Sequence, residues 1–168
     1  MGKLGRRYKD RDFIQTPEGL LFCVIGYQHP SDRVISYLKY VPSPTGQWGV
    51  SGLRYSRSMK AYTTPELLKN IDWLKEKYPR YVFHSDVFSI EISAVLIKDI
   101  RRYYYPEERL QQLLEKGPAD LLEDAALRLI KLLSERSGVS LNSFGITGSI
   151  LLCIHNPRFS DIDVVIYG

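Results

Sequence analysis

The last quarter of the chain holds the stretch that decides the fold of its C-terminal part. Residues 144–149 read FGITGS, residues 150–160 read ILLCIHNPRFS, and residues 161–166 read DIDVVI. The first run is apolar and partly β-branched and ends in a Gly-Ser turn, and Asn156-Pro157 stops the apolar run that follows. This order predicts a strand, a turn, a short buried helix over residues 150–155 and a second strand over 161–166.

Two carboxylates stand side by side in the second predicted strand. Because successive strand side chains point to opposite faces, Asp161 and Asp163 are expected to share one face, with Ile162 on the other. Like charges this close repel each other, and a hard divalent cation such as Mg²⁺ or Mn²⁺ would relieve the repulsion. The Gly148-Ser149 turn at a helix start offers backbone N–H groups and a hydroxyl to an anion. The pattern therefore predicts a phosphate cradle beside a metal site.

The spacing of these residues is similar to a known signature. Gly148-Ser149, eleven intervening residues and then Asp161-Ile162-Asp163 resemble the signature of the DNA polymerase β-type nucleotidyltransferase superfamily, and Ser160 matches its common Ser-Asp-hydrophobic-Asp form. The resemblance covers residues 143–167. It implies that Gly148 and Ser149 hold the β and γ phosphates of a nucleoside triphosphate, and that Asp161 and Asp163 bind the catalytic metal ions.

The resemblance also implies a third acid, which in the superfamily lies on a later strand and helps to activate the attacking hydroxyl. The chain ends at Gly168, so we expect this acid to be missing, unless one of three upstream acids supplies it. The upstream candidates are Asp86, Glu91 and Asp99. Three arrangements stay open: a sheet completed by the N-terminal part, a sheet shared with another subunit of a homo-oligomer, or a truncated piece of a longer enzyme.

The function implied by the resemblance is transfer of a nucleotidyl group from an NTP to an unknown acceptor by a two-metal mechanism. Arg158 is close enough in sequence to add positive charge for the nucleotide, or it is a solvated loop arginine. The chain is alternatively a non-catalytic module that binds a nucleotide or nucleic acid, or a scaffold in which the Asp pair is solvated. The approach of a third acid to Asp161 and Asp163 distinguishes the enzyme from the binding module.

The composition is that of an ordinary globular chain with a mild excess of positive charge. Of the 168 residues, 44% are hydrophobic and 25% are charged, and the net charge is +4. This charge permits RNA or another nucleic acid as a partner without requiring one. Cys23 and Cys153 form neither a metal motif nor a disulfide framework, which favours a reducing cytoplasmic compartment. Neither a membrane span nor a signal peptide is expected.

Residues 1–91 are predicted to form a mainly β unit with one helix. Strands are expected over 12–15, 20–25 and 33–41, and Thr16-Pro17-Glu18-Gly19 supplies the first turn, which together indicate an antiparallel meander.

The helix of this part is expected to begin at Thr63 or Thr64. Thr63 with Glu66 fits a capping box, Pro65 fits the first turn, and Tyr78-Pro79 ends the helix.

Residues 92–168 are predicted to form helices that lead into the partial nucleotidyltransferase-like core, which makes the whole chain α+β. Apolar residues recur at helical spacing over 92–104 and indicate a helix there. A second helix is expected over 106–116, and a third between a capping Asp120 and Gly138.

Two basic segments are candidates for contact with nucleic acid. The N-terminal arm is either a solvated terminus or a phosphate-contacting arm, and its basic residues are Lys3, Arg6, Arg7, Lys9 and Arg11. The second segment follows a loop rich in Pro, Gly and Ser, and alternates cations with tyrosines: Arg54, Tyr55, Arg57, Lys60 and Tyr62. Such a mixture suits single-stranded nucleic acid, and equally an edge strand with extended side chains.

Overall fold

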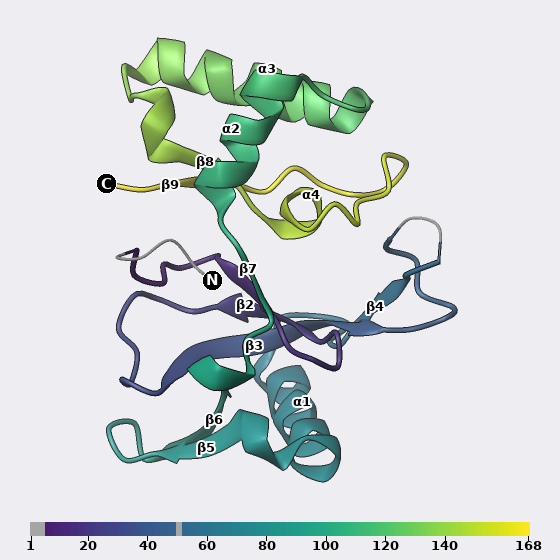
Figure 1. The fold of residues 1–168 in the computed structure, drawn as a ribbon, viewed down its shortest axis with the longest axis vertical. Coiled ribbons are helices and arrows are strands. Elements are labelled where there is room, and N and C mark those ends of the chain that lie inside the picture. Colours follow the sequence, from purple (N-terminus) through teal and green to yellow (C-terminus); the bar gives the residue numbers. More distant parts are fainter. Residues whose placement is uncertain (1–5, 50–51) are drawn as a thin grey trace. The chain divides into compact units, whose positions relative to one another are not determined.

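The structure is a computed structural model, and it describes residues 6–49 and 52–168 (Figure 1). The internal contacts of the chain group it into two compact units. Unit 1 comprises Met1–Gly46 and Tyr55–Tyr103, and unit 2 comprises Gln47–Arg54 and Tyr104–Gly168. Both strands and helices are present, so the expected α+β class is confirmed. Among the described residues, no helix is long and apolar enough to cross a membrane.

Unit 1 is built on a β-sheet to which seven strands of the described residues belong, in the order β5-β6-β3-β2-β1-β7 with β4 beside β3. The strands are β1 (Phe13–Gln15), β2 (Leu21–Val24), β3 (Arg33–Pro42), β4 (Tyr55–Arg57), β5 (Val82–Ser85), β6 (Ile90–Leu96) and β7 (Arg102–Tyr104). β1, β2 and β3 pair in succession and antiparallel, which confirms the expected meander. β3 also pairs antiparallel with β4 and β6, and β6 with β5.

The first hairpin closes at the predicted turn. The N–H of Gly19 donates to the carbonyl of Thr16 at 2.9 Å, and the N–H of Thr16 donates to the carbonyl of Leu20 at 3.0 Å. Gly19 has φ +82, a conformation that glycine adopts without the steric cost of a Cβ. The turn therefore sets the register in which Ile14 lies opposite Phe22.

The helix predicted over residues 92–104 is wrong. β6, a short 3₁₀ turn at Ile97–Asp99 and β7 occupy this stretch. β6 lies between β3 and β5, and three consecutive residues, Ser93, Ala94 and Val95, are buried. A strand buried on both faces loses the alternating pattern that identifies a strand in sequence, so its apolar residues imitate helical spacing.

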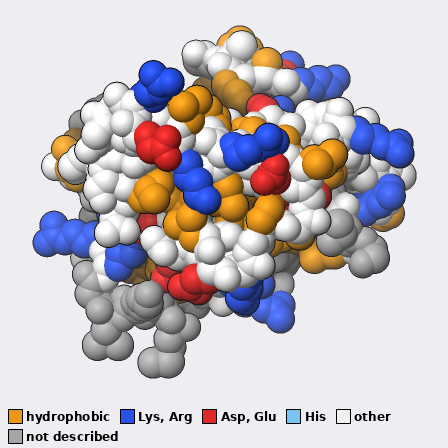
Figure 2. Space-filling view, turned by 90° about the horizontal axis from the view of Figure 1, so that it is seen from above, with side chains coloured by type: hydrophobic (Ala, Val, Ile, Leu, Met, Phe, Trp, Pro, Cys, Tyr) orange, Lys and Arg blue, Asp and Glu red, His pale blue; other side chains and the backbone are white. Residues whose placement is uncertain are grey.

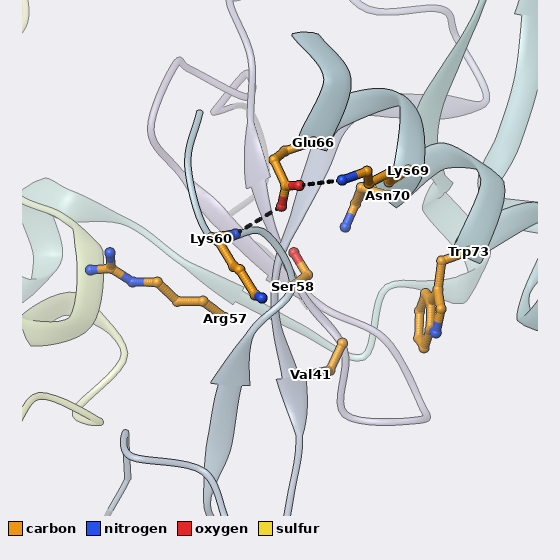
Figure 3. A pocket seen from close by; sticks show the side chains of 8 residues that line it. All are labelled: Val41, Arg57, Ser58, Lys60, Glu66, Lys69, Asn70 and Trp73. Atoms are coloured by element: carbon orange, nitrogen blue, oxygen red, sulfur yellow. Dashed lines mark hydrogen bonds and ion pairs between the residues drawn. The ribbon is translucent and has the colours of Figure 1, made fainter. Parts of the chain in front are cut away.

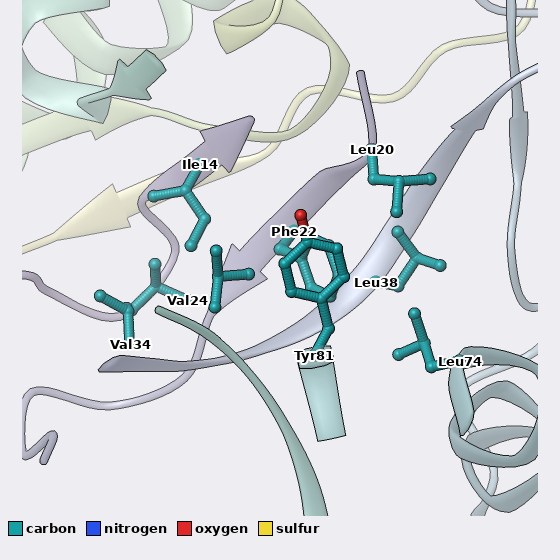
Figure 4. Close-up of a cluster of buried hydrophobic side chains, with 9 residues drawn as sticks. Ile14, Leu20, Phe22, Val24, Val34, Leu38, Leu74 and Tyr81 are labelled. Atoms are coloured by element: carbon teal, nitrogen blue, oxygen red, sulfur yellow. The ribbon is translucent and has the colours of Figure 1, made fainter. Parts of the chain in front are cut away.

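A cluster of buried side chains stabilises unit 1 (Figure 4). Its nine members come from the sheet, from the residue before β2, from α1 (Thr64–Lys77) and from the 3₁₀ turn η1 (Pro79–Tyr81): Ile14, Leu20, Phe22, Val24, Val34, Leu38, Leu74, Tyr81 and Val95. The rings of Phe22 and Tyr81 meet edge to face at 5.5 Å, a favourable arrangement for aromatic rings. The Tyr81 hydroxyl donates to the carboxylate of Glu18 at 2.8 Å, so the polar end of this buried ring is satisfied.

Helix α1 begins and ends as predicted, after Thr63 and at Tyr78. The capping box between Thr63 and Glu66 is not formed within the described residues. The Glu66 carboxylate instead accepts from the backbone N–H of Lys60 at 3.2 Å and from Lys69 Nζ at 2.9 Å.

The N-terminal basic arm is partly tied to unit 1. Arg6 donates twice to the fully buried carboxylate of Asp12, at 2.6 and 2.9 Å, and the N–H of Lys9 donates to the same carboxylate at 2.9 Å. Lys3 lies outside the described residues. The positive charge of Arg6 therefore neutralises the buried Asp12 carboxylate, which is a structural role.

Unit 2 contains three helices and two strands in its described residues. These are α2 (Pro106–Lys116), α3 (Leu121–Ser137), α4 (Gly148–Leu151), β8 (Phe144–Ile146) and β9 (Val164–Ile166). The predictions for α2 and α3 are confirmed: Asp120 caps α3 by accepting from the N–H groups of Leu122 and Glu123, and Gly138 ends it with φ +73. A 3₁₀ turn, η3 (Leu141–Ser143), leads into β8.

The buried face of unit 2 lies between its helices and its two strands. Leu110 and Leu113 of α2 and Ala126 and Ile130 of α3 pack against Phe144 and the other buried residues of the hairpin. α3 also carries exposed leucines, namely Leu121, Leu129, Leu132 and Leu133. Figure 2 views the molecule from the α3 side and shows hydrophobic side chains interspersed with charged ones.

Candidate functional site

The candidate site lies on the β8–β9 hairpin. The two strands pair antiparallel, with Ile146 opposite Val164. The pairing continues beyond the strands, because the N–H of Thr147 donates to the carbonyl of Asp163 at 2.9 Å. This bond places Asp163 directly opposite the end of β8, where the Gly148-Ser149 turn begins.

The second strand is shorter than predicted. β9 begins at Val164, so Asp161 and Asp163 lie on the segment that enters the strand. The reason is the length of β8, which offers three residues for pairing before the chain turns at Gly148. Asp161 is exposed and Asp163 is half-buried. The expectation that both carboxylates occupy one face of a regular strand is therefore wrong, although both stand at the entrance to β9.

Gly148 is held against the Asp163 carboxylate. It has φ +66, and a Cβ added to it would lie 2.0 Å from Oδ2 and 3.0 Å from Cγ of Asp163. Such distances are far below van der Waals contact, and the left-handed backbone conformation is itself costly for any other residue. Any other residue at this position would have to displace the Asp163 side chain and adopt a strained backbone conformation. The structure brings together one residue of the predicted cradle and one predicted metal ligand.

The helix after the turn is shorter than the predicted helix over residues 150–155. α4 ends at Leu151, and Cys153 adopts φ +55 as its N–H donates to the carbonyl of Ile150 at 3.2 Å. The carbonyl of Ser149 accepts from the N–H of Ile154 at 3.0 Å, which folds the chain back over the turn. Ser149 is 3% exposed, so in this structure its side chain is packed inside unit 2. Its contact with a phosphate stays a prediction.

The loop between α4 and the acid pair is closed by reciprocal hydrogen bonds. The N–H of Asn156 donates to the hydroxyl of Ser160 at 2.9 Å, and the N–H of Ser160 donates to the carbonyl of Asn156 at 2.8 Å. Ser160, which matched the signature, therefore orders the approach to Asp161. The Arg158 N–H donates to Asn156 Oδ1 at 3.1 Å, and its side chain is exposed on this loop.

A segment from far upstream supports the same loop. Gln47–Arg54 belongs to unit 2, although the neighbouring residues on both sides belong to unit 1. The Trp48 ring meets the Phe159 ring edge to face at 5.6 Å, and the N–H of Gly49 donates to the carbonyl of Ile154 at 2.8 Å. Sequence reasoning identified this segment as a long loop and had no signal for its partner.

A buried polar network behind the turn was missed from the sequence. Arg109 of α2 forms an ion pair with Glu123 of α3, and its Nε donates to the carbonyl of Ile150 in α4 at 3.1 Å. The second carboxylate oxygen of Glu123 accepts from the N–H of Ala119 at 2.8 Å. Glu123 is 3% exposed. The network thus joins three helices and holds the backbone immediately after Ser149.

His155 and Asp120 extend this network. His155 Nε2 lies 2.7 Å from Asp120 Oδ2, and the His155 side chain is 9% exposed. Partial burial would raise the pKa of Asp120, but the hydrogen bonds from the Glu123 N–H and from His155 outweigh it, so the pKa of Asp120 is lowered. One side chain therefore caps α3 and orients His155 at the start of the loop.

Two acids, Asp161 and Asp163, lie on the segment that enters β9. Among the described residues, no group of three or more His, Cys, Asp or Glu side chains is arranged to hold a metal ion. The three upstream candidates for a third acid all belong to unit 1: Asp86, Glu91 and Asp99.

The chain is similar to a longer archaeal protein. Uncharacterized protein MJ1086 of Methanocaldococcus jannaschii is 34% identical over 160 residues, which cover 94% of this chain and 47% of that protein. The chain thus spans about half the length of this relative. No protein-family model and no solved structure matches this chain.

Proposed function

We propose that this chain carries the nucleotide-binding part of a DNA polymerase β-type nucleotidyltransferase. The observation that carries the proposal is the contact between the Gly148 backbone and the Asp163 carboxylate. A phosphate cradle and a metal ligand must adjoin if a metal ion is to bridge them to the same nucleotide. The order of strand, Gly-Ser turn, short helix, ordered loop and acid pair supports the same reading.

Each residue of the hairpin has a role in this proposal. Gly148 and Ser149 hold the β and γ phosphates of an NTP through the N–H groups of the turn, and the absence of a Cβ at Gly148 leaves room for the Asp163 carboxylate beside them. Asp161 and Asp163 hold Mg²⁺ or Mn²⁺, and Arg158 adds positive charge from the loop.

The donor set of the hairpin suits Mg²⁺. This ion takes oxygen ligands and is commonly held by one or two carboxylates together with substrate phosphates. When bound, it would neutralise phosphate charge and orient the attack of the acceptor. A third carboxylate, from unit 1, from a partner subunit of a homo-oligomer or from a longer form of the protein, would complete the site.

The proposal is tested by measuring ATP binding in the presence and absence of Mg²⁺ by calorimetry. We expect Mg²⁺ to strengthen binding to the native chain and to have little effect on the Asp161→Asn/Asp163→Asn variant. The matched control is Glu115→Gln, which removes an exposed acid of α2 from the same unit. If Mg²⁺ strengthens ATP binding equally in the double variant, the hairpin is not the metal site.

A second variant tests the cradle. Gly148→Ala places a methyl group against Asp163 and a non-glycine residue at positive φ, which costs about 1–2 kcal/mol. This conformational cost lowers the stability of the fold with and without ATP. ATP affinity is expected to fall about tenfold for a different reason, because the displaced Asp163 carboxylate no longer holds a metal ion beside the cradle. Unchanged affinity in a folded Gly148→Ala protein would contradict the cradle.

Measuring turnover distinguishes an enzyme from the alternative, a non-catalytic nucleotide-binding module. We expect the chain by itself to release little pyrophosphate from a panel of NTPs, because the hairpin supplies two carboxylates to a reaction that uses three. A strong pyrophosphate signal that Asp163→Asn abolishes would show that a third acid reaches the hairpin, and Glu91 and Asp99 would be the first residues to substitute.

A further inference from the structure

A pocket of about 450 Å³ lies in unit 1, beside α1 and the β3–β4 pair (Figure 3). Its walls come from residues that are distant in sequence, namely β3, the end of β4, the segment after β4 and one face of α1. All of its lining residues belong to unit 1. The pocket is therefore formed by residues of unit 1 alone.

The pocket is positively charged. Its lining contains three cations and one carboxylate, which are Arg57, Lys60, Lys69 and Glu66. The hydrogen bond from Lys69 lowers the pKa of Glu66, so this carboxylate is ionised and engaged with Lys69 at neutral pH. Figure 3 shows the Lys60 ammonium near the centre of the labelled side chains and the Arg57 guanidinium farther out on one side. The excess of cations favours an anionic ligand.

Asn70 supplies a buried amide to the lining of the same pocket. This residue of α1 is 4% exposed, and its Oδ1 has no hydrogen-bond partner among the described residues. This oxygen has almost no accessible surface and lies inside the unit. Glu66, Asn70 and Trp73 follow one another at helical spacing on one face of α1, and the Asn70 side chain projects toward the pocket (Figure 3). The end of the Asn70 side chain that Figure 3 shows toward the pocket is its nitrogen, so Asn70 can donate a hydrogen bond to a ligand there.

Trp73 provides an aromatic wall. Its indole lies on the opposite side of the pocket from Arg57 in Figure 3 and is 37% exposed, although the residue stands in the middle of a helix. Its ring is 5.6 Å from that of Tyr78, which supports it from behind the pocket lining. A partly exposed indole beside cations is the combination that stacks a nucleobase while phosphate is neutralised.

We propose that this pocket binds one nucleotide, with its base stacked on Trp73, an acceptor atom of the base or ribose at the Asn70 amide nitrogen, and its phosphate at Lys60. The nucleotide comes either from a free mononucleotide or from the end of a single-stranded nucleic acid. The site is independent of the hairpin, so nucleotide binding here does not depend on Asp161 or Asp163.

The two tryptophans of the chain make a direct test possible, because Trp48 belongs to unit 2 and Trp73 to the pocket. In a Trp48→Phe protein, all tryptophan fluorescence comes from Trp73. AMP and a single-stranded oligo(A) of five nucleotides are titrated separately at low and high salt. We expect saturable quenching that weakens at high salt, since phosphate contacts are salt-sensitive.

A matched pair of lysine variants assigns the phosphate contact. Lys60→Gln is expected to weaken binding about tenfold, the effect of losing one hydrogen bond to a charged group. Lys98→Gln removes an exposed lysine of the same unit that does not line the pocket, and is expected to leave the affinity unchanged. The same comparison by calorimetry in the chain with both tryptophans removes any dependence on the Trp48→Phe substitution.

Each outcome bears on the proposal. Equal affinity for AMP and oligo(A) identifies a free mononucleotide as the ligand, and tighter binding of oligo(A) identifies a nucleic-acid end. Absence of quenching by both ligands at low salt overturns the proposal, as does equal weakening by Lys60→Gln and Lys98→Gln. Quenching must persist when Asp161→Asn/Asp163→Asn is added, and its loss would assign the signal to the hairpin instead.

Discussion

The two units of this protein are stabilised in different ways. Unit 1 has strands of up to ten residues and a core of nine apolar side chains. Unit 2 pairs two strands of three residues each, and a two-stranded hairpin is at best marginally stable alone. Its hairpin depends on packing against α2 and α3, and its turn depends on a buried ion pair. The candidate site of unit 2 is therefore more sensitive to the loss of polar contacts than the pocket of unit 1.

The stabilities of the two units can be measured separately because each unit contains one tryptophan. A Trp48→Phe protein reports the unfolding of unit 1 through Trp73, and a Trp73→Phe protein reports the unfolding of unit 2 through Trp48. Urea unfolding followed by fluorescence in these two backgrounds gives the free energy of unfolding seen by each unit.

The largest effect is expected from the apolar core of unit 1. Phe22→Ala removes a fully buried ring and should lower the free energy of unfolding by about 4 kcal/mol, measured by urea unfolding in the Trp48→Phe background. Phe88→Ala, at a position that is 60% exposed, is the matched control and should change it by less than about 0.5 kcal/mol. Similar values for both would contradict the assignment of Phe22 to the core.

The next effect concerns the ion pair of unit 2. Glu123→Gln leaves the charge of Arg109 buried without its partner, and should cost about 3 kcal/mol in the Trp73→Phe background. Glu135→Gln, an exposed acid of the same helix, should have little effect. The double variant Arg109→Met/Glu123→Leu removes both charges and should recover much of the loss. A double variant that is no more stable than Glu123→Gln would argue against this electrostatic account.

A smaller effect is expected where β8 packs on α2. A Cβ at Gly145 would lie 2.6 Å from Pro106 Cβ and 2.8 Å from the Pro106 carbonyl carbon. Gly145→Ala should therefore push β8 away from α2. We expect it to lower the free energy of unfolding by about 2 kcal/mol, measured by urea unfolding. Gly168→Ala, where a Cβ meets open space, is the control. If the two variants are equally stable, the close approach of β8 to α2 is not a constraint.

The smallest effect is a pH dependence in unit 1. Burial lowers the pKa of His29, and its Nδ1 accepts from the N–H of Ile35 at 3.2 Å, which requires the neutral ring. The unfolded chain therefore binds more protons than the folded one below its ordinary pKa of about 6.5, so stability falls as pH decreases from there toward the folded pKa. Urea unfolding at pH 7.5 and pH 5.5 should show this loss in the native chain. His29→Gln should show a smaller loss, and an equal loss would assign the pH dependence to other groups.

Several elements were predictable because local chemistry determines them. The turn at residues 16–19, Pro106 at the start of α2, and Asp120 and Gly138 at the two ends of α3 act through their own backbone preferences. β6 was not predictable in this way, because its apolar pattern reflects its place between two neighbouring strands. In the sequence, Glu123 is typical of an exposed acid in the first turn of a helix. Nothing local indicates that Arg109 of another helix is its ion-pair partner.

The α+β class and the ends of three helices could be read from the amino-acid sequence. These features depend on side-chain type, periodicity and capping, which act over a few residues. The folded chain was needed to show that Gly148 contacts Asp163, that Gln47–Arg54 joins the C-terminal unit, and that Lys60, Asn70 and Trp73 line one pocket. Such contacts join residues that are distant in sequence, and they form only where strand register and helix packing bring those residues together.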